Sequence, residues 1–520
     1  MRTARFVLGH DVGTSGDKAV LCDLQGRTVA SSYRPYPLVR PRSAWAEQDP
    51  ERLLAAVFET SLELAERANA AGGEVVAIGV SAQMFNVVAV DRQGAALSPL
   101  VSWLDARSTA QATSIAARFD LDAQYERFGN VFTAKDIVPK ILWLRDALPA
   151  AWEASAAFLD CKDFVNGRLT GRLATDHAGA SAYFLYDIEA RQWDRAAAND
   201  LGVPPETLPP TLPATEPLGG LAPDAARAMG VPAGTPVAVC AGDVPAGQVG
   251  AGAARPGEAH LSLGTASYFG ISLDRPLRDP GRRLGLLCHM DPRRWLLWAE
   301  METGGGALGW WREVLGQAGG AARTSPGRVD RLAVAVPPEE ADRLAAAVRP
   351  EDVDVLFAPW LSGERVPLWD HHARGAFVGL GLHHGSGHLT RAVMEGIAYQ
   401  LRWVLEYAER FGVDVGGIRV IGGAGLGTIL PQILADVLGR PLALVADPQS
   451  AGARGAALCA LAALGAGELD ALAAGTLLSG TIEPEAARKR LYDERFAAFR
   501  GLHAALEGPT RALGQREPPS

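Results

Sequence analysis

The sequence predicts a duplicated α/β protein whose two related halves face each other across a cleft. A strand, a Gly/Thr turn and a returning strand open the chain near residues 5–22, and the same pattern recurs at 258–273. Buried-looking strands alternate with amphipathic helices along both halves. The chain has 520 residues, which is too many for one core and allows two large domains.

Composition narrows the class of protein. The chain is 48% hydrophobic and 21% charged, which excludes a disordered protein. Its net charge of −9 repels phosphate backbones, so we expect no nucleic-acid partner. The five scattered cysteines form no CxxC pair, which favours a reducing cytoplasm over a disulfide frame or a zinc site. No apolar run reaches ~18 residues and no signal-like start is present, so we expect neither membrane insertion nor secretion.

Lysine and histidine usage singles out a few positions. Arginine has replaced lysine almost everywhere, so each remaining lysine is a candidate for a specific role: Lys18, Lys135, Lys140, Lys162 and Lys489. The pairs His371-His372 and His383-His384 have no acidic or cysteine partner at ligand spacing. We therefore expect them to be solvated loop residues.

The first half begins with two strands, at 5–9 and 18–22. About ten residues separate them, too few for a crossover helix, so they form a hairpin. A helix should begin at Asp49-Pro50, with Asp49 as N-cap and Pro50 in its first turn. Its apolar face comprises Leu53, Leu54, Val57, Phe58 and Leu62, and a buried strand at 75–80 follows.

The second half repeats this opening. Residues 204–236 are dense in Pro, Gly and Ala, which indicates a loop-rich approach to a boundary near 245. Strands are expected at 236–240, 258–263 and 268–273, with a turn at 264–267. A long helix should span about 389–410 and stop at Gly412. A strand at 418–421 then enters the glycine run 422–427 and another helix.

The turn in the first hairpin has the residues of an anion site. Asp11 ends a strand, where a carboxylate can hold a hydrated Mg²⁺. Gly13 to Gly16 permit a tight turn whose amides point at one spot, while Thr14 and Ser15 add hydroxyls and Lys18 adds a charge. A plain hairpin remains the alternative. The GxxxxGK[ST] pattern is absent, so this is not a P-loop.

Asp243 is the second candidate. It follows the strand at 236–240 and precedes a Gly-rich, helix-prone stretch. There it could cap the helix, or it could accept the hydroxyl proton of an alcohol during phosphoryl transfer. The glycine runs 304–306 and 422–427 suit close approach to a flat ligand, but neither has the Rossmann pattern.

The ordered motifs resemble those of the FGGY carbohydrate kinases, xylulokinases in particular, within the sugar kinase/Hsp70/actin superfamily. The resemblance runs from Gly9 to about Gly465. It rests on GHDVGTSGDK at 9–18, WAEQDP at 45–50, SAQMFN at 81–86, SWLDAR at 102–107, AGD at 241–243, LSLGTAS at 261–267, LSGERVPLWDHHARGAFVGL at 361–380 and IGGAG at 421–425.

This resemblance implies an α/β fold of two RNase H-like domains flanking a deep cleft. Residues 1–245 would form the N-terminal FGGY domain, with the sugar site and first phosphate loop. Residues 246–520 would form the C-terminal one, with the nucleotide site and second phosphate loop. The activity would be transfer of the γ-phosphoryl group of ATP, with Mg²⁺, to a ketopentose, D-xylulose first. Ribulose, erythritol, glycerol or a sugar acid is the alternative acceptor, and a homodimer is left open.

The resemblance also assigns residues. Asp243 would be the general base, in contact with the sugar, and Asp11 would hold Mg²⁺ through water. The phosphates would lie against Gly13, Thr14, Ser15, Lys18, Gly264 and Thr265, and the nucleotide against Gly305, Gly309, Gly423, Ala424 and Gly427. The sugar pocket would be shaped by Met84, Phe85, Trp103 and Asp105.

Two pairs of residues, Phe85-Asn86 and Leu426-Gly427, depart from the family pattern. Phe85-Asn86 stands where xylulokinase-like sequences have His-Gly, so one polar sugar contact is missing, and we expect Asn86 to restore a contact from a shifted position. Gly427 follows Leu426 where polar or bulkier residues are common. A chaperone-like ATPase would need neither Asp243 nor the sugar-contact motif, which argues against it. The intact Asp11, Thr14 and Asp243 argue against a carbohydrate sensor that binds without catalysis.

Overall fold

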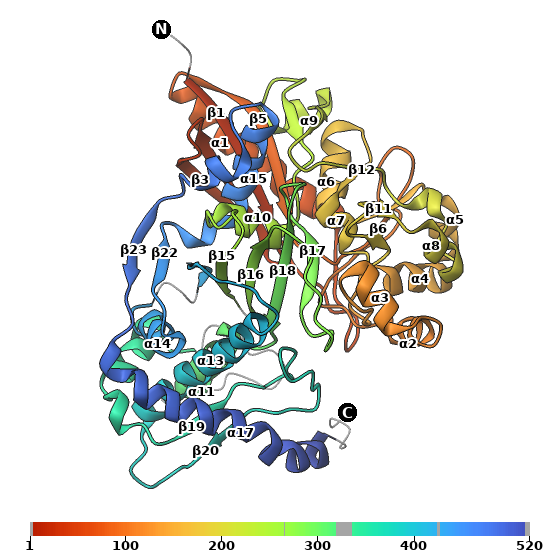
Figure 1. Cartoon of the computed structure of the whole chain (residues 1–520). Coiled ribbons are helices and arrows are strands. Elements are labelled where there is room, and N and C mark those ends of the chain that lie inside the picture. Colours follow the sequence, from red (N-terminus) through yellow and green to blue (C-terminus); the bar gives the residue numbers. More distant parts are fainter. Residues whose placement is uncertain (1–3, 265, 319–334, 424–426, 515–520) are drawn as a thin grey trace. The chain divides into compact units, whose positions relative to one another are not determined.

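A computed structural model gives the fold of residues 4–264, 266–318, 335–423 and 427–514 (Figure 1). The chain divides into two compact units. Unit 1 comprises Met1–Glu258, Gly270–Leu297 and Gln449–Leu477, and unit 2 comprises Ala259–Phe269, Trp298–Pro448 and Leu478–Ser520. Unit 1 thus takes two segments from the later half of the chain. The boundary at 245/246 stays a prediction.

Unit 1 is built on a six-stranded mixed sheet in the order β13-β14-β5-β1-β2-β3. Its strands are β1 (Ala4–Val12), β2 (Gly16–Asp23), β3 (Thr28–Pro35), β5 (Gly73–Ala82), β13 (Pro217–Gly220) and β14 (Pro236–Ala238). β1, β2 and β3 form an antiparallel meander, while β5 runs parallel to both β1 and β14. The predicted first hairpin is confirmed, and its register places Asp11 opposite Lys18.

The central strand β1 is covered on both faces, and its residues alternate between them. Leu8 and Val12 join the core formed with α1 (Pro50–Ala70), and Ser61 of that helix contacts His10. Gly9 lies against α15 (Ala451–Ala463), where any side chain would collide with the Ala453 carbonyl and the Ala457 amide (Figure 1). Because side chains alternate, Asp11 lies on the same face as Gly9.

Helix α1 begins as predicted. The Asp49 carboxylate accepts a hydrogen bond from the Glu51 amide, and Pro50 is the first helical residue. Leu53, Leu54 and Val57 are buried, and Phe58 packs partly against the core. Leu62 is 41% exposed, so its predicted place in the apolar face is wrong. The buried stripe runs instead through the small residues that let the helix pack close to the sheet: Ala56, Thr60, Ser61, Ala65 and Ala68.

The rest of unit 1 consists of short elements. Two-stranded ladders are formed by β4 (Glu47–Gln48) with β7 (Leu100–Val101), β6 (Val88–Val90) with β8 (Ala157–Leu159), β9 (Thr175–Asp176) with β12 (Thr211–Leu212), and β10 (Tyr186–Asp187) with β11 (Gln192–Trp193). Its other helices are α2 (Thr109–Ala116), α3 (Leu121–Phe128), α4 (Ile137–Ala147), α5 (Pro149–Ala154), α6 (Cys161–Thr170), α7 (His177–Ser181), α8 (Arg195–Leu201), α9 (Pro223–Met229), α10 (Asp243–Gly250) and α16 (Leu469–Ala473). The Pro-rich stretch 204–236 therefore holds β12, β13 and α9 between its loops.

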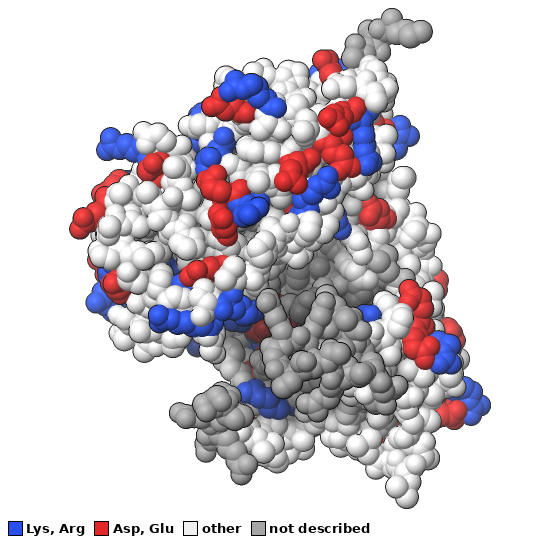
Figure 2. All heavy atoms as spheres, turned by 180° about the vertical axis from the view of Figure 1, so that it is seen from behind, with Lys and Arg blue, Asp and Glu red and all other residues white. Residues whose placement is uncertain are grey.

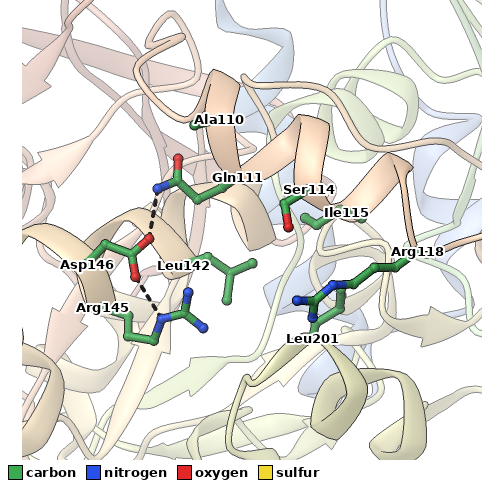
Figure 3. A pocket seen from close by; sticks show the side chains of 9 residues that line it. All are labelled: Ala110, Gln111, Ser114, Ile115, Arg118, Leu142, Arg145, Asp146 and Leu201. Carbon is green, nitrogen blue, oxygen red and sulfur yellow. Dashed lines mark hydrogen bonds and ion pairs between the residues drawn. The ribbon is translucent and has the colours of Figure 1, made fainter.

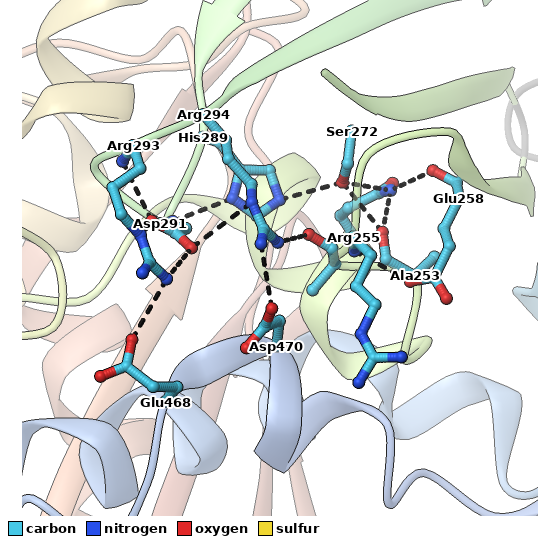
Figure 4. Close-up of polar contacts among 12 residues, drawn as sticks. Ala253, Arg255, Glu258, Ser272, His289, Asp291, Arg293, Arg294, Glu468 and Asp470 are labelled. Atoms are coloured by element: carbon cyan, nitrogen blue, oxygen red, sulfur yellow. Dashed lines mark hydrogen bonds and ion pairs between the residues drawn. The ribbon is translucent and has the colours of Figure 1, made fainter. Parts of the chain in front are cut away.

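A buried histidine ties three segments of unit 1 together (Figure 4). The Asp291 amide donates to Nδ1 of His289, and Nε2 lies 3.2 Å from the Ser272 hydroxyl. The same hydroxyl donates to the Ala253 carbonyl. Burial lowers the pKa of His289 to about 4 despite the opposing negative charge of Asp291, so the ring is neutral in the fold.

We expect His289 to make unit 1 sensitive to acid. Its folded pKa lies below the unfolded value of about 6.5, so its contribution is complete above pH 6.5. That contribution, about 3 kcal/mol, is lost as the pH falls toward 4. Denaturant unfolding of the wild type at pH 5 and pH 7 should show a larger loss of stability than the same pair for His289→Asn. His372→Asn, at an exposed histidine, is the control and should behave as wild type.

A seven-stranded sheet has the order β17-β18-β16-β15-β21-β22-β23. Its strands are β15 (Glu258–Leu263), β16 (Ser267–Leu273), β17 (Gly285–Cys288), β18 (Trp295–Met301), β21 (Gly417–Ile421), β22 (Leu442–Val445) and β23 (Leu478–Ile482). The predicted strands at 258–263, 268–273 and 418–421 are confirmed within a residue at each end.

The helices of unit 2 are α11 (Gly305–Ala318), α12 (Pro338–Ala346), α13 (Ser386–Glu409), α14 (Ile429–Leu438) and α17 (Lys489–Gly514), with a ladder of β19 (Leu356–Ala358) and β20 (Ala376–Val378). The long helix α13 confirms the predicted one, including its buried face and the turn at Gly412, whose φ is 81°. Among the described residues no helix is long and apolar enough to cross a membrane. On the face shown in Figure 2 acidic and basic side chains lie side by side.

Candidate functional site

Asp11 has a carboxylate with room for a ligand. It is half-buried at the end of β1, and its oxygens lie against Gly452 in the first turn of α15, where a side chain would displace them. No described residue donates a hydrogen bond to this carboxylate. Burial and the negative charge of Asp17 raise its pKa to about 6, against the opposing positive charge of Lys18.

The turn after Asp11 leaves backbone donors unused. The Gly13 amide closes the turn on the Gly16 carbonyl, whereas no described group accepts from the amides of Thr14 or Ser15. Lys18 reaches across to the Gln449 carbonyl, 3.0 Å away, at the approach to α15. Free amides beside a cation are the donors that an anion requires, as the sequence predicted for this turn.

Asp243 is the first residue of α10. The N-cap of that helix is Gly242, and the Asp243 carboxylate accepts from the adjacent Val244 amide, so the alternative that Asp243 is the helix cap is wrong. Burial, together with the negative charges of Asp11 and Asp160, raises the pKa of Asp243 to about 8. Carboxylates that raise one another's pKa in this way are suited to share a proton or a divalent cation.

Met84 and Phe85 follow β5 and lie beside this carboxylate cluster. Met84 is buried against Gly242, the residue that precedes Asp243. Phe85 has a φ of 64°, which is uncommon for a bulky residue. The Asp160 carboxylate holds the loop by accepting from the Phe85 amide at 2.9 Å, and Lys140 donates to the Phe85 carbonyl at 2.7 Å. Strain of this kind persists where the surroundings over-determine the backbone, which is typical of binding sites.

Asn86 is buried and fully engaged within the protein. Its amide nitrogen donates to the Gln83 carbonyl and to Asp160, and its side-chain oxygen accepts from the Trp103 amide. The sequence expectation that Asn86 restores a sugar contact therefore finds its polar atoms already bonded. The Phe85 ring, by contrast, is only partly buried and lies 6.0 Å from the ring of Phe184.

Trp103 connects the sugar-contact residues to the phosphate turn. Its indole nitrogen donates to the Thr14 hydroxyl at 2.9 Å, and that hydroxyl lies 3.3 Å from the Gln83 side-chain oxygen. The Thr14 hydroxyl is thus used to orient Trp103. The donors of the turn that stay open to a ligand are therefore its backbone amides.

Asp105 lies in a buried ion pair. It accepts hydrogen bonds from the Ala46 amide and from Arg107, whose guanidinium packs 3.7 Å from the ring centroid of Trp45 and 4.6 Å from that of Trp143. A cavity of about 290 Å³ opens beside this cation and its two indoles. The motifs at 45–50 and 102–107 therefore support each other, while the role of Asp105 toward hydroxyls stays a prediction.

The predicted nucleotide residues lie in unit 2. Gly264 follows β15, Gly305 is the first residue of α11, and Gly309 has open space where a side chain would be. Gly423 is exposed at the end of β21, and Gly427 lies against the Asp342 carboxylate, which accepts from the Thr428 amide. Thr265 and Ala424 lie outside the described residues.

Sequence reasoning missed Asp160 and understated Lys140. Asp160 caps α6 and binds both amides of the Phe85-Asn86 loop, and its pKa is raised to about 7, chiefly by burial. Burial lowers the pKa of Lys140 to about 7. The scarcity of lysine marked Lys140, whereas nothing near Asp160 in the sequence distinguishes it from an ordinary helix cap.

A smaller cavity of about 170 Å³ lies among α2, α4 and the end of α8 (Figure 3). Arg118 and Arg145 point into it, and the Asp146 carboxylate accepts from Gln111 and Arg145. None of the predicted site residues lines this cavity.

Comparisons with known proteins identify the relatives of this chain. The models described as the N-terminal and C-terminal domains of the FGGY family of carbohydrate kinases match residues 6–250 and 259–464. The chain is 31% identical to a xylulose kinase of Escherichia coli K12 over 96% of its length and 99% of the relative. It is 27% identical to a gluconokinase of Bacillus subtilis over 92% of its length and 90% of the relative.

A solved structure shares the fold. The crystal structure described as a xyloylose kinase from Brucella ovis superposes with a TM-score of 0.87 at 28% identity, over 97% of this chain and 99% of the other. The predicted two-domain α/β fold is thereby confirmed.

Proposed function

Because the chain belongs to the FGGY family of carbohydrate kinases and is an ATP-dependent sugar kinase, we propose that its acceptor is D-xylulose. One observation carries the proposal: Met84 packs against Gly242, beside the half-buried Asp243. Met84 follows β5 and belongs to the motif that resembles that of xylulokinases. The xylulose kinase among its relatives matches over nearly the whole chain. The five cysteines, which all lie among the described residues, are buried and form no disulfide, which supports the proposal of a reducing cytoplasm.

Asp243 is the general base of the proposed reaction. It accepts the proton of the attacking hydroxyl, which then attacks the γ-phosphoryl group in line. The amides of Thr14 and Ser15, with Lys18, stabilise the negative charge that spreads over the phosphoryl oxygens. Gly264 and Thr265 belong to the second phosphate loop, and Gly305, Gly309, Gly423, Ala424 and Gly427 to the proposed nucleotide site.

The chain's own residues fit a Mg²⁺ ion. The Asp11 carboxylate is half-buried, accepts no hydrogen bond from a described residue and shares the field of Asp243. Oxygen donors with retained water are what Mg²⁺ prefers. Bound there, the ion would supply charge neutralisation for the phosphate oxygens, with Asp11 as its holder.

The alternative is the same chemistry on another acceptor, such as ribulose, erythritol, glycerol or a sugar acid. Phe85 favours it, since a phenyl ring cannot hydrogen-bond a hydroxyl. The gluconokinase among the relatives makes a sugar acid a specific candidate. A panel of these compounds in a coupled ADP-release assay separates the cases. D-Xylulose should give the highest kcat/KM, and a higher value for any other compound rejects it as the acceptor.

Phe85→His tests the sugar contact directly. Histidine tolerates the positive φ at this position and adds a donor, so kcat/KM for D-xylulose should rise about tenfold, the value of one added hydrogen bond. Phe85→Leu removes the ring without adding a donor and should show no such rise. A Phe85→His enzyme with unchanged KM and kcat for every sugar would show that residue 85 does not touch the acceptor.

A further inference from the structure

Two histidines and an aspartate converge in unit 2, and none of them is a residue assigned above. Nε2 of His383 lies 3.2 Å from Oδ1 of Asp354, and Nε2 of His384 contacts the same oxygen. One ligand atom from each of the three lies within 4.8 Å of the others. The side chain of His384 is only 1% exposed, so the prediction of a solvated loop residue is wrong for it.

The backbone around these residues holds them together. His383 and His384 lie in the loop between β20 and α13, and Asp354 lies just before β19. β19 and β20 pair antiparallel, with Leu356 opposite Val378, so the ladder brings Asp354 beside the loop. Gly379 has a φ of 93° and contacts the Asp354 carbonyl, which fixes the turn.

We propose that Asp354, His383 and His384 form a binding site for a divalent cation of the zinc class. Imidazole nitrogens with one carboxylate suit Zn²⁺, Co²⁺ or Ni²⁺ and disfavour Mg²⁺, which prefers oxygen ligands. The three residues supply one carboxylate oxygen and two nitrogens, so water completes a four-coordinate ion. Both imidazoles approach the same carboxylate oxygen, so the three ligand atoms can surround one cation.

Proton positions set the strength of this site. The Gly381 amide donates to Nδ1 of His384 at 2.8 Å, so Nε2 carries the proton that it shares with Asp354. Binding a cation at Nε2 moves the imidazole proton to Nδ1 and requires the Gly381 amide to turn away. Affinity is therefore lower than at a site with a preformed acceptor behind each histidine.

The bound cation would join the loop that precedes α13 to the strand that begins the β19-β20 ladder. Because it binds only the folded arrangement, it would stabilise unit 2 by an amount that rises with the logarithm of the free cation concentration once that concentration exceeds Kd. The proposal concerns neither the sugar nor the phosphate residues, so it stands apart from the proposed acceptor.

The test is a titration of tagless, chelator-treated full-length protein with Zn²⁺ in the presence of millimolar Mg²⁺, followed by calorimetry and by thermal unfolding. Wild type should bind one equivalent and show a raised melting temperature. His383→Ala, at the 60% exposed ligand, should fold normally and bind about 100-fold more weakly. Asp354→Asn should do the same, while His372→Ala, an exposed histidine outside the cluster, should match wild type.

Co²⁺ gives a second readout. The wild-type complex should show visible d–d absorption typical of nitrogen and oxygen ligands, and His384→Ala should lose it. Equal Zn²⁺ affinity of wild type, His383→Ala and Asp354→Asn would overturn the proposal, as would binding that Mg²⁺ abolishes. Neither result would touch the sugar panel, so failure of this site and failure of the proposed acceptor are distinguishable.

Discussion

Asp243→Asn should lower turnover by about 100-fold or more while nucleotide affinity stays near that of wild type, because the amide cannot accept the hydroxyl proton. Asparagine preserves the size of the side chain and can still accept from the Val244 amide, so the fold should persist. Initial rates with saturating sugar and ATP give kcat, and fluorescence titration gives nucleotide affinity. Asp224→Asn, at an exposed carboxylate, is the matched control.

The pH profile distinguishes a base from a structural carboxylate. The pKa of Asp243 is raised to about 8, so its ionised fraction increases with pH, reaches one half near pH 8 and levels off above it. Wild-type kcat/KM should therefore rise between about pH 6 and 8. Residual activity of Asp243→Asn should lack this limb. If the variant keeps half of its activity and the same profile, the proton goes elsewhere.

Asp11→Asn should raise the Mg²⁺ concentration for half-maximal rate by at least tenfold, the scale for losing a group that holds a metal through water. It should also shift the rising limb of the pH profile to lower pH, because the negative charge of Asp11 helps to raise the pKa of Asp243. Measuring rate against Mg²⁺ at several pH values checks both effects.

A role of Asp11 in folding alone predicts a different result. It would lower stability and leave the Mg²⁺ dependence and the pH limb of the surviving activity unchanged. Asp23→Asn, at a carboxylate in the turn at the other end of the same hairpin, should leave both unchanged.

Local sequence signals, such as helix caps and apolar periodicity, correctly predicted the helices in which they occur. Asp49-Pro50 marked the start of α1, and the apolar spacing marked α13, because capping and periodicity act within a few residues. The prediction that Leu62 is buried was wrong, because the buried side of α1 is determined by the small residues that pack against the sheet. That choice depends on packing partners outside the window that periodicity covers.

The residues of the candidate site that lie within one short motif could be predicted from the sequence. Those that act through contacts between distant segments could not. Asp11, the turn after it and Asp243 were found from short motifs and the family resemblance. Asp160 was missed because it acts on the Phe85-Asn86 loop from 75 positions away in the chain. The pairing of His384 with Asp354 spans 30 positions and was missed for the same reason.

The glycines under α15 have a consequence for synthesis on the ribosome. Because Gly9 and Gly79 have no side chains, helix α15 can pack directly on one face of the first sheet. The ribosome translates this helix almost four hundred residues after Gly79. Until residue 463 has emerged, that face has no native cover, and nascent chains must keep it from sticking to other hydrophobic surfaces. A fragment ending at residue 448 should accordingly be recovered as aggregate or bound to chaperones. Co-expression of residues 449–520 should make this fragment soluble only if α15 can bind to the sheet as a separate chain.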